Sequence, residues 1–387
     1  MMNFNENGTA IATEYSANFL SYLGIASQIP NLLLNFINIF VPVKSDLTKR
    51  ICISLMIVGA MIVFTMLFVY VDTWSWMFGF FVLTLLSIVL LNGANGIYQN
   101  SIFGLACDFP FKFTNAVIIG NNLCGTFVTI VNIITVLVSN NPANAAFAYF
   151  GISLLTLAVC FASFFLLKKQ PFYQYYYKKA LRERENENEE NKSGPEVQDY
   201  INAFKQGGPQ MLNVYLVFFV TLTVFPGIMV DIRDERPGEK YSFVLPEQFF
   251  VSITTFLLFN VFAFIGSMLA GRYQWPSPNR LWMVVYPRLL FIPFFIFCNY
   301  RPLSRTFPVL FESTWLYVFA GILMSISSGY LSGLSMMYIP RVVEPSKGRI
   351  ASMMAAFFLI FGIVSGLTFT IFVAKFIEKA GPLTAVA

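Results

Sequence analysis

The chain has 387 residues, of which 57% are hydrophobic and 12% are charged, and its formal net charge is +5. This composition is far from that of a soluble globular domain and indicates a protein embedded in lipid. The chain has no histidine, the commonest general base and metal ligand, and its five cysteines form no Cys-x-x-Cys pair. We therefore expect no catalytic centre, no metal site and no cofactor. Because the basic residues lie between hydrophobic segments, we expect no nucleic-acid partner.

Ten hydrophobic segments follow one another along the chain. Each is long enough to cross a bilayer, which requires about 20 apolar residues in a helix. Because lipid offers no hydrogen-bond partner to a bare peptide group, such segments must be helical. The sequence therefore predicts an all-α polytopic membrane protein with about ten transmembrane helices. The predicted spans are 15–42, 51–71, 76–107, 113–139, 145–167, 211–230, 247–271, 281–300, 315–339 and 350–377.

The longest polar interruption lies near the middle and divides the spans into two helical bundles of five. We predict an N-terminal segment at 1–14, a first bundle at 15–167, a central loop at 168–208, a second bundle at 209–378 and a tail at 379–387. Of the 25 lysines and arginines, 17 lie in loops on the side of the central loop and 7 on the other side. The positive-inside rule then places the central loop in the cytosol and both termini outside. Asn7, in Asn7-Gly8-Thr9, is a predicted glycosylation site.

The central loop begins with a basic and aromatic stretch from Lys168 to Lys179, in which lysines flank one phenylalanine and four tyrosines. This composition is typical of a helix that lies at the level of the lipid headgroups. A solvated linker is the alternative.

Amide side chains recur along the hydrophobic spans, where polar groups are costly and tend to face the interior of a bundle. In the first and third spans they are three or four residues apart and so share one helical face. Amides both donate and accept hydrogen bonds, which suits an uncharged solute such as a nucleobase or a sugar. The alternative is that they hold helices together. The polar positions are Gln28, Asn31, Asn35 and Asn38, then Asn92, Asn95 and Gln99, then Asn115, Asn121, Asn122 and Asn132, and finally Ser252, Thr254, Thr255, Asn260 and Ser267.

Arg288 is the only charged residue well inside a predicted span. Because no carboxylate lies clearly at mid-span, we expect its side chain to reach toward the cytosolic face and to have a structural or gating role. Gly120 and Gly125 stand at a small-residue spacing and are predicted to be helix-packing positions.

An ordered set of short motifs resembles those of the equilibrative nucleoside transporters, a solute carrier family related to the major facilitator proteins. The resemblance covers about residues 15–377. Its pieces are Ile29-Pro30, Gln99-Asn100-Ser101-Ile102-Phe103-Gly104-Leu105-Ala106, Phe225-Pro226, Phe256-Leu257-Leu258-Phe259-Asn260, Trp275-Pro276, Arg288-Leu289, Cys298-Asn299, Ser328-Gly329-Tyr330-Leu331 and Met354-Ala355-Ala356-Phe357-Phe358.

The resemblance implies two bundles with a major-facilitator-like fold. It also implies facilitative transport of nucleosides or related neutral solutes by alternating access, in the plasma membrane. The partners are then a small-molecule substrate and the lipid bilayer. Pro226 joins the predicted structural or gating positions Arg288, Gly120 and Gly125. The predicted substrate-binding positions are Gln28, Asn31, Asn95, Gln99, Asn122, Phe256, Asn260, Ala263 and Ser267.

The chain departs from the pattern of this family in two ways. The family's usual first helix, with its Leu-Pro-Trp-Asn type motif, is not found in this sequence, which suggests a truncated or unusually short member. Family members also carry an aspartate and an arginine one turn apart in the seventh span, where this chain has Ala263 and Ser267. Nucleobases, organic cations or other organic solutes as substrates, and an inactive truncated form, are therefore the alternatives.

Overall fold

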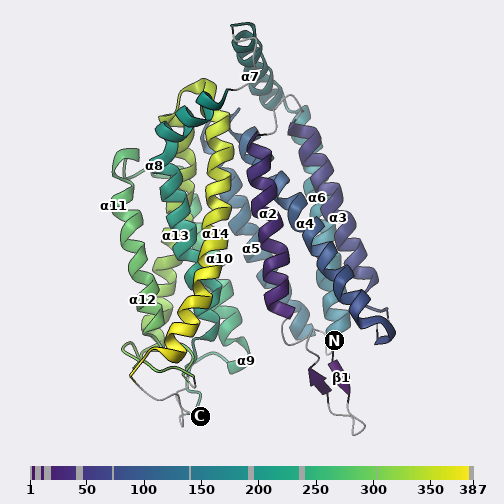
Figure 1. Ribbon diagram of the computed structural model, residues 1–387, viewed down its shortest axis with the longest axis vertical. Helices are drawn as coiled ribbons and strands as arrows, with labels where there is room; N and C mark the ends of the chain where they lie inside the picture. The colour runs from purple at the N-terminus through teal and green to yellow at the C-terminus, as the bar shows by residue number, and fades with distance from the viewer. Residues whose placement is uncertain are drawn as a thin grey trace. The chain divides into compact units, whose positions relative to one another are not determined.

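The computed structural model describes residues 2–4, 10–12, 19–40, 47–71, 74–138, 141–190, 196–234, 240–302 and 304–382, and most of them are helical (Figure 1). They form two compact units. One comprises Met1–Ile102 with Ile134–Arg182, and the other comprises Phe103–Ile133 with Glu183–Ala387. Most of the fourth predicted span is therefore grouped with the C-terminal spans. The predicted glycosylation site at Asn7 lies outside the described residues.

The described residues of the first unit form five long helices and one short antiparallel strand pair. The strands are β1 (Met2–Phe4) and β2 (Ala10–Ala12). The helices are α2 (Phe19–Phe40), α3 (Leu47–Leu67), the 3-10 turn η1 (Trp74–Trp76), most of α4 (Met77–Ala106), α6 (Pro142–Lys169) and the first part of α7 (Pro171–Glu190).

The second unit contains most of α5 (Lys112–Val138) and the remaining helices. Its main elements are α8 (Val197–Leu222), α10 (Leu258–Arg272), α13 (Thr314–Val342) and α14 (Gly348–Lys379). The shorter ones are the π-helical turns η2 (Thr223–Ile228) and η4 (Val251–Leu257), the 3-10 turns η3 (Met229–Asp231), η5 (Pro278–Arg280), η6 (Tyr286–Leu290) and η7 (Pro345–Lys347), and the helices α9 (Glu247–Phe250), α11 (Trp282–Val285) and α12 (Phe291–Ile296).

Local sequence explains where several helices begin. The Asn141 side chain accepts a hydrogen bond from the Ala143 N–H (2.9 Å), and Pro142 opens α6, as is usual at a helix N-terminus. At the start of α8, the Glu196 N–H donates to the Asp199 carboxylate (3.0 Å). This cap starts α8 inside the predicted central loop, about three turns before the predicted second bundle. The basic and aromatic stretch is helical, as expected, and forms the start of α7.

Eight helical stretches in the described part of the chain are long and apolar enough to cross a membrane. The expected number was ten. The predicted eighth span instead forms the short elements α11, η6 and α12, because Pro287 and Pro293 each remove a backbone donor and interrupt a regular helix. The predicted first span forms α2, which is not among the eight. The eight are Leu47–Leu67, Met77–Ala106, Lys112–Thr135, Ala143–Lys169, Val197–Asp231, Glu247–Arg272, Thr314–Val342 and Pro345–Lys379.

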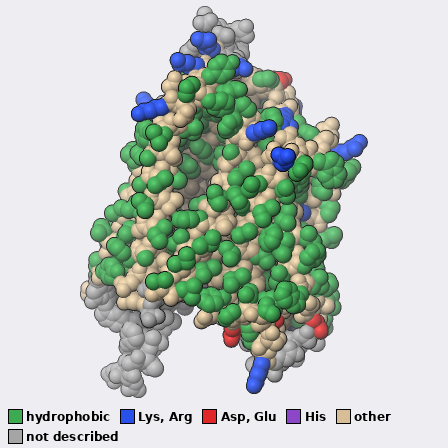
Figure 2. Space-filling model, turned by 180° about the vertical axis from the view of Figure 1, so that it is seen from behind, with side chains coloured by type: hydrophobic (Ala, Val, Ile, Leu, Met, Phe, Trp, Pro, Cys, Tyr) green, Lys and Arg blue, Asp and Glu red, His purple; other side chains and the backbone are tan. Residues whose placement is uncertain are grey.

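Hydrophobic side chains cover much of the molecular face drawn in Figure 2. Large apolar residues are widely exposed; Leu155 is 67% exposed, Leu323 47% and Phe372 64%. Soluble proteins rarely expose contiguous apolar surface of this extent. This surface and the eight long apolar helices make the chain a multi-pass membrane protein.

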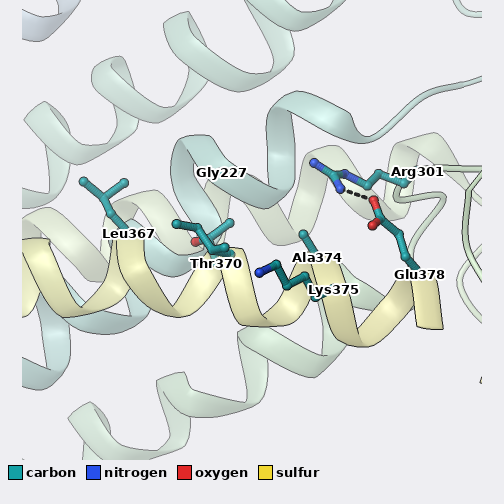
Figure 3. Close-up of a pocket in the computed structure, with 8 residues that line it drawn as sticks. Gly227, Arg301, Leu367, Thr370, Ala374, Lys375 and Glu378 are labelled. Carbon is teal, nitrogen blue, oxygen red and sulfur yellow. Dashed lines mark hydrogen bonds and ion pairs between the residues drawn. The ribbon is translucent and has the colours of Figure 1, made fainter. Parts of the chain in front are cut away.

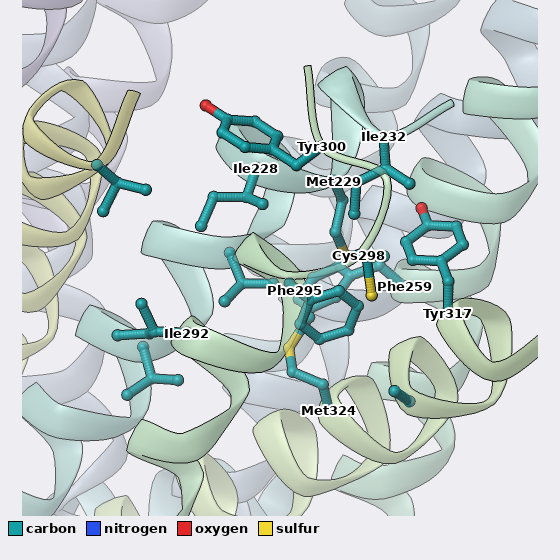
Figure 4. Packing of buried hydrophobic residues seen from close by; sticks show 14 of the residues in the cluster. Ile228, Met229, Ile232, Phe259, Ile292, Phe295, Cys298, Tyr300, Tyr317 and Met324 are labelled. Atoms are coloured by element: carbon teal, nitrogen blue, oxygen red, sulfur yellow. The ribbon is translucent and has the colours of Figure 1, made fainter. Parts of the chain in front are cut away.

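Close helix packing builds the second unit. In α14, a Cβ at Gly362 would lie 2.6 Å from the Tyr215 carbonyl oxygen of α8, so these helices meet backbone to backbone. A hydrophobic core lies near the C-terminal end of α8, where η2, η3, α12 and α13 come together (Figure 4). Met229, Phe295 and Tyr317 are at most 1% exposed there. This packing fixes the positions of the helices and turns that carry the polar residues of the second unit.

Candidate functional site

In the first unit, the buried amides of α2 form a chain of hydrogen bonds with α4. The Asn38 amide donates to Asn100 Oδ1 (2.9 Å), and Asn100 donates in turn to Asn35 Oδ1 (3.3 Å). Asn35 donates to the Gly96 carbonyl oxygen (3.3 Å), and at the other end the Arg50 guanidinium of α3 donates to Asn38 Oδ1 (2.5 Å). All links run in one direction, so the cation polarises a row of amides that ties α2, α3 and α4 together.

Asn31 lies at the same contact between α2 and α4. It is 9% exposed, and a Cβ built at Gly96 would lie 2.7 Å from the Asn31 carbonyl oxygen and 2.8 Å from its Oδ1. Gly96 is therefore the residue that lets the two helices approach. The buried Asn31 Oδ1 has no hydrogen-bond donor among the described residues. A role for Asn31 in substrate binding stays a prediction.

Three predicted amides of the first unit form no side-chain hydrogen bond within the described part of the chain. Gln28 of α2 and Asn95 and Gln99 of α4 are half-buried, and none hydrogen-bonds through its side chain to another described residue. Asn92, on the same stripe of α4, instead donates to the Ile88 carbonyl of its own helix (3.0 Å). Half-buried amides without protein partners have hydrogen-bonding capacity left for a polar solute.

In the second unit, amides join α5 to α10. Asn115 donates to the Ser267 carbonyl oxygen (2.8 Å). Two turns further along α5, Asn122 donates to the Ala263 carbonyl oxygen (3.3 Å). The positions rise along α5 as they fall along α10, so the two helices run antiparallel. The amide nitrogens of Asn115 and Asn122 thus hold helices together, which is the alternative that the sequence left open.

Asn260 of α10 makes a further contact with α5, nearer the C-terminal end of α5. Its amide donates to the Phe256 carbonyl oxygen (2.9 Å) and to Thr129 Oγ1 (3.3 Å). A Cβ at Gly125 would overlap Asn260 Oδ1, so α5 needs glycine there. No described atom lies within 4 Å of a Cβ built at Gly120. The packing role predicted for both glycines therefore has a structural basis at Gly125, and at Gly120 it stays a prediction.

The two positions at which the chain departs from the family pattern are buried. Ala263 is 1% exposed and Ser267 is 0% exposed. The Ser267 hydroxyl donates to the Phe264 carbonyl of its own helix (2.8 Å). A Cβ at Gly329 of α13 would overlap the Ala263 carbonyl oxygen, so the backbones of α10 and α13 touch here. Larger side chains at these positions would need the surrounding helices to separate.

Phe256 belongs to an aromatic cluster beside a break in α8. Its ring lies edge-on to Phe225 (5.6 Å between centroids), and Phe225 stacks on Phe259 (3.7 Å). Within η2, Phe225 has extended backbone angles (φ −107°, ψ 130°). Pro226 follows it and has no N–H to continue the helix. Pro226, predicted as structural, thus stands at an irregular turn, and such turns are frequent at functional sites.

Arg288 of η6 is buried, so the expectation that its side chain reaches toward the cytosolic face is wrong. It is 3% exposed. Its guanidinium donates to the carbonyl oxygens of Val217 (3.0 Å) and Met324 (3.4 Å). It also donates to the hydroxyls of Thr221 (2.9 Å) and Ser327 (3.1 Å). Because α8 and α13 together supply four neutral acceptors, the cation is held inside the unit and joins three elements.

Several residues that carry these networks were not singled out from the sequence. Asn100 follows Gln99 directly and so lies about 100° further around α4, on the face toward α2. Thr129 stands one turn after Gly125, and Thr221 and Ser327 are ordinary hydroxyl residues of apolar helices. The usable signal was the four-residue spacing of Gly96 and Asn100, which puts a small residue and an amide on one face. In the part of the chain that the structure describes, no group of three or more acidic, cysteine or histidine residues could hold a metal ion.

Comparison with known proteins agrees with this arrangement of apolar helices and neutral polar groups. The family model described as "Nucleoside transporter" matches residues 85–375. The chain belongs to this family, whose members are passive transporters and not enzymes.

Individual relatives are similar over most of their length. The human protein "Equilibrative nucleoside transporter 1" is 27% identical over 92% of this chain and 82% of its own. "Equilibrative nucleoside transporter 3" from Rattus norvegicus is 27% identical over 90% of this chain and 76% of its own. Human "Equilibrative nucleoside transporter 2" is 27% identical over 91% and 84%, respectively.

Proposed function

We propose that this protein is a facilitative carrier of nucleosides or closely related neutral solutes. The observation that carries the proposal is the pattern of half-buried amides at Gln28, Asn95 and Gln99, none of which bonds another described residue, in a chain of this family. Amides can serve both the hydroxyls of a sugar and the edge of a base. No phosphate-binding Gly-x-x-x-x-Gly-Lys-Ser/Thr motif is present in the sequence, which argues against an ATP-driven pump. The proposed driving force is the gradient of the solute itself.

The proposed architecture is ten transmembrane helices in two bundles that rock about a central site, as in major facilitator proteins. The domains are those predicted from the sequence: bundles at 15–167 and 209–378, with a cytosolic loop at 168–208 between them. The segment 1–14, with a glycan at Asn7, and the tail 379–387 lie outside the cell. The charge distribution supports this orientation, and we place the protein in the plasma membrane.

The proposed binding residues fall into two sets. Gln28, Asn95 and Gln99 supply amides that bond no other described residue. Asn260 and Phe256 supply an amide and an aromatic face. Asn31, Asn122, Ala263 and Ser267 complete the predicted set, and their present helix contacts would loosen when the carrier changes conformation. Arg288, Pro226, Gly120 and Gly125 keep the proposed structural or gating role.

A second candidate substrate class is less polar organic solutes, including nucleobases and organic cations. The observation that favours it is the pair of buried neutral residues Ala263 and Ser267, at positions where the family carries a charged acceptor and donor. Each lost hydrogen bond to a charged group is worth about 1.5–3 kcal/mol. Organic cations are the weaker member of this class, because no carboxylate lies at mid-span.

The test is uptake of radiolabelled uridine, adenosine and adenine by the purified full chain in liposomes. A facilitative carrier brings the internal concentration up to the external one and no higher, and a collapsed proton gradient leaves the rate unchanged. Gln99→Ala should lower the uptake rate per molecule about tenfold, because a bound solute loses a hydrogen bond and a buried polar contact. Asn92→Ala is the matched control on α4, since the Asn92 amide is satisfied by its own helix. No uptake of any of the three solutes, or equal rates for wild type and Gln99→Ala, would contradict the proposal.

A further inference from the structure

A groove in the second unit runs along one face of α14 near the C-terminal end of that helix (Figure 3). Its volume of about 410 Å³ lies in the usual range for small-molecule sites. The α14 residues that line it are spaced three and four apart and so cover about 16 Å of one helical face. The lining residues are Leu367, Thr370, Ile371, Ala374, Lys375 and Glu378 of α14, with Gly227 of η2 and Arg301.

The groove exists because η2 interrupts α8 beside α14. Gly227 has no side chain to fill the space, and a Cβ there would lie 2.6 Å from the Thr370 methyl carbon. The Thr370 hydroxyl is held in turn, because it donates to the Thr223 carbonyl oxygen (2.9 Å). Backbone and hydrogen-bonded atoms therefore shape this part of the floor, and no flexible side chain closes it.

One end of the groove is apolar and lies toward the middle of the span. Leu367, Ile371 and Ala374 form this end, and Ile371 is 57% exposed. Because α14 crosses the membrane and ends at Lys379, the apolar end faces hydrocarbon and the other end reaches the membrane surface. A ligand that follows the groove must therefore change from apolar to polar along its length.

The surface end of the groove carries charges that are unevenly paired. Arg301 donates to Asp231 Oδ2 (2.7 Å) and to Glu378 Oε1 (2.5 Å), so one cation serves two carboxylates. Lys375 forms no ion pair with the described residues, and its ammonium group points along α14 toward Thr370, into the groove (Figure 3). Lys375 and Glu378 are three residues apart, which puts their Cβ atoms about 5–6 Å from each other. The groove thus offers one unpaired positive and one surplus negative charge side by side.

We propose that this groove binds a phospholipid with a zwitterionic headgroup. One acyl chain lies against Leu367, Ile371 and Ala374, and the phosphate contacts the Lys375 ammonium. The cationic group of the headgroup lies near Glu378 and Asp231, whose combined charge Arg301 only half neutralises. An anionic lipid would bring a net negative charge to these carboxylates, and a free phosphate ion would leave the apolar part of the groove empty. The charge pattern and the polarity gradient together select the zwitterionic lipid.

The test is native mass spectrometry of the purified full chain in detergent, titrated with phosphatidylcholine, phosphatidylglycerol and inorganic phosphate. Wild-type protein should retain phosphatidylcholine in preference to phosphatidylglycerol and should not retain phosphate. Lys375→Gln should weaken phosphatidylcholine binding about fivefold, the effect of one basic side chain at a lipid surface. Ala374→Leu narrows the groove without changing its charge and should weaken binding of both lipids.

Lys379→Gln is the matched control, because Lys379 is an exposed lysine one turn further along α14 and does not line the groove. It should bind lipid like the wild type. Size-exclusion chromatography and the melting temperature verify that each variant is folded. Equal phosphatidylcholine binding by wild type, Lys375→Gln and Ala374→Leu would overturn the proposal. A preference for phosphatidylglycerol, or displacement of the lipid by inorganic phosphate, would also overturn it. Solute uptake is not the measurement, so this result is independent of the transported substrate.

Discussion

At the scale of single residues, Arg288 shows how this protein keeps a charge in its interior. A buried charge is costly unless it is well hydrogen-bonded. Four neutral oxygens accept from the guanidinium, and among the described residues no carboxylate forms an ion pair with it. The planar guanidinium spreads five N–H donors over three nitrogens and here reaches acceptors on two helices, whereas an ammonium has three donors on one nitrogen. The placement of the guanidinium donors therefore contributes to the stability of the fold as much as the positive charge does.

We predict that Arg288→Lys destabilises the protein at least as much as Arg288→Met. Lysine keeps the buried charge but loses hydrogen bonds worth about 1.5–3 kcal/mol each, whereas methionine removes the charge. The acceptors left behind have other partners, since Thr221 also bonds Ser328 and Ser327 also donates to Met324. Methionine should therefore cost only about 1–3 kcal/mol. Melting temperatures in detergent would measure both variants, and a wild-type value for Arg288→Lys would contradict the argument.

Asp234, outside the spans, ties the loop after η3 to the start of α13. Its carboxylate accepts hydrogen bonds from the Thr314 hydroxyl (2.6 Å) and from the Ser242 N–H (3.0 Å). Burial alone would raise the pKa of Asp234, but these hydrogen bonds to the charged form lower it more, so the pKa lies below its usual value.

Because the pKa of Asp234 is lower in the folded state than in the unfolded state, its contribution to stability is complete above the unfolded pKa. It is lost as the pH falls through the folded pKa. We predict that Asp234→Asn lowers the melting temperature at pH 6–7 and that its difference from wild type shrinks as the pH drops below about 4. The measurement is the difference between the two melting curves across pH 3–7. A difference that is constant with pH would show that the carboxylate charge is not what matters.

At the scale of helices, the second unit is assembled by glycines at backbone contacts. Gly266 of α10 and Gly329 of α13 each occupy a place where a Cβ would overlap a carbonyl of the facing helix. Gly362 and Gly366 do the same between α14 and α8, where a Cβ would lie 2.6 Å and 2.5 Å from a carbonyl oxygen. In lipid, where apolar surface gives little drive to helix association, such close packing is a main source of stability.

We predict that Gly329→Ala and Gly120→Ala have opposite outcomes. At Gly329 the new methyl overlaps the Ala263 carbonyl, and overpacking of this kind typically costs about 1–3 kcal/mol. At Gly120 the described residues leave open space, so alanine gains up to about 1 kcal/mol of helix propensity. Melting temperatures of the two variants give the comparison. A strongly destabilised Gly120→Ala would show instead that this glycine packs against another part of the chain.

At the scale of the whole molecule, hydropathy was enough to predict the class and most helices, because a helix in lipid must be long and apolar. It could not predict that Pro287 and Pro293 divide one span into short turns, since its composition is as apolar as that of its neighbours. The amide stripes were visible in the sequence, but their partners were not. Asn35 and Asn38 hydrogen-bond with Asn100, whereas the side chain of the neighbouring Gln99 bonds no other described residue. Which amide bonds a helix and which stays free depends on the rotation of each helix, and periodicity alone does not fix that rotation.

Substrate selectivity belongs to this scale too, because Ala263 and Ser267 can act on a solute only if α10 separates from its neighbours. We predict that the unmodified chain transports ordinary nucleosides weakly and that Ala263→Asp with Ser267→Arg raises uridine and adenosine uptake about tenfold or more. The two new charges would stand four residues apart and pair on one helical face. Ser267→Arg alone would place an unpaired charge at a fully buried position and should reduce the amount of folded protein.

Three controls test this last prediction. Uptake is measured in liposomes and normalised to the amount of folded protein, so a folding defect is not counted as lost transport. Ala263→Leu with Ser267→Met adds similar bulk without charge and should not raise nucleoside uptake, which separates the effect of charge from that of helix spacing. A charged pair should help nucleosides more than adenine, because only a nucleoside carries ribose hydroxyls that can donate to the new carboxylate. If the unmodified chain already takes up uridine as fast as the double variant, the neutral pair does not limit recognition, and the specificity must be carried by the free amides of α2 and α4.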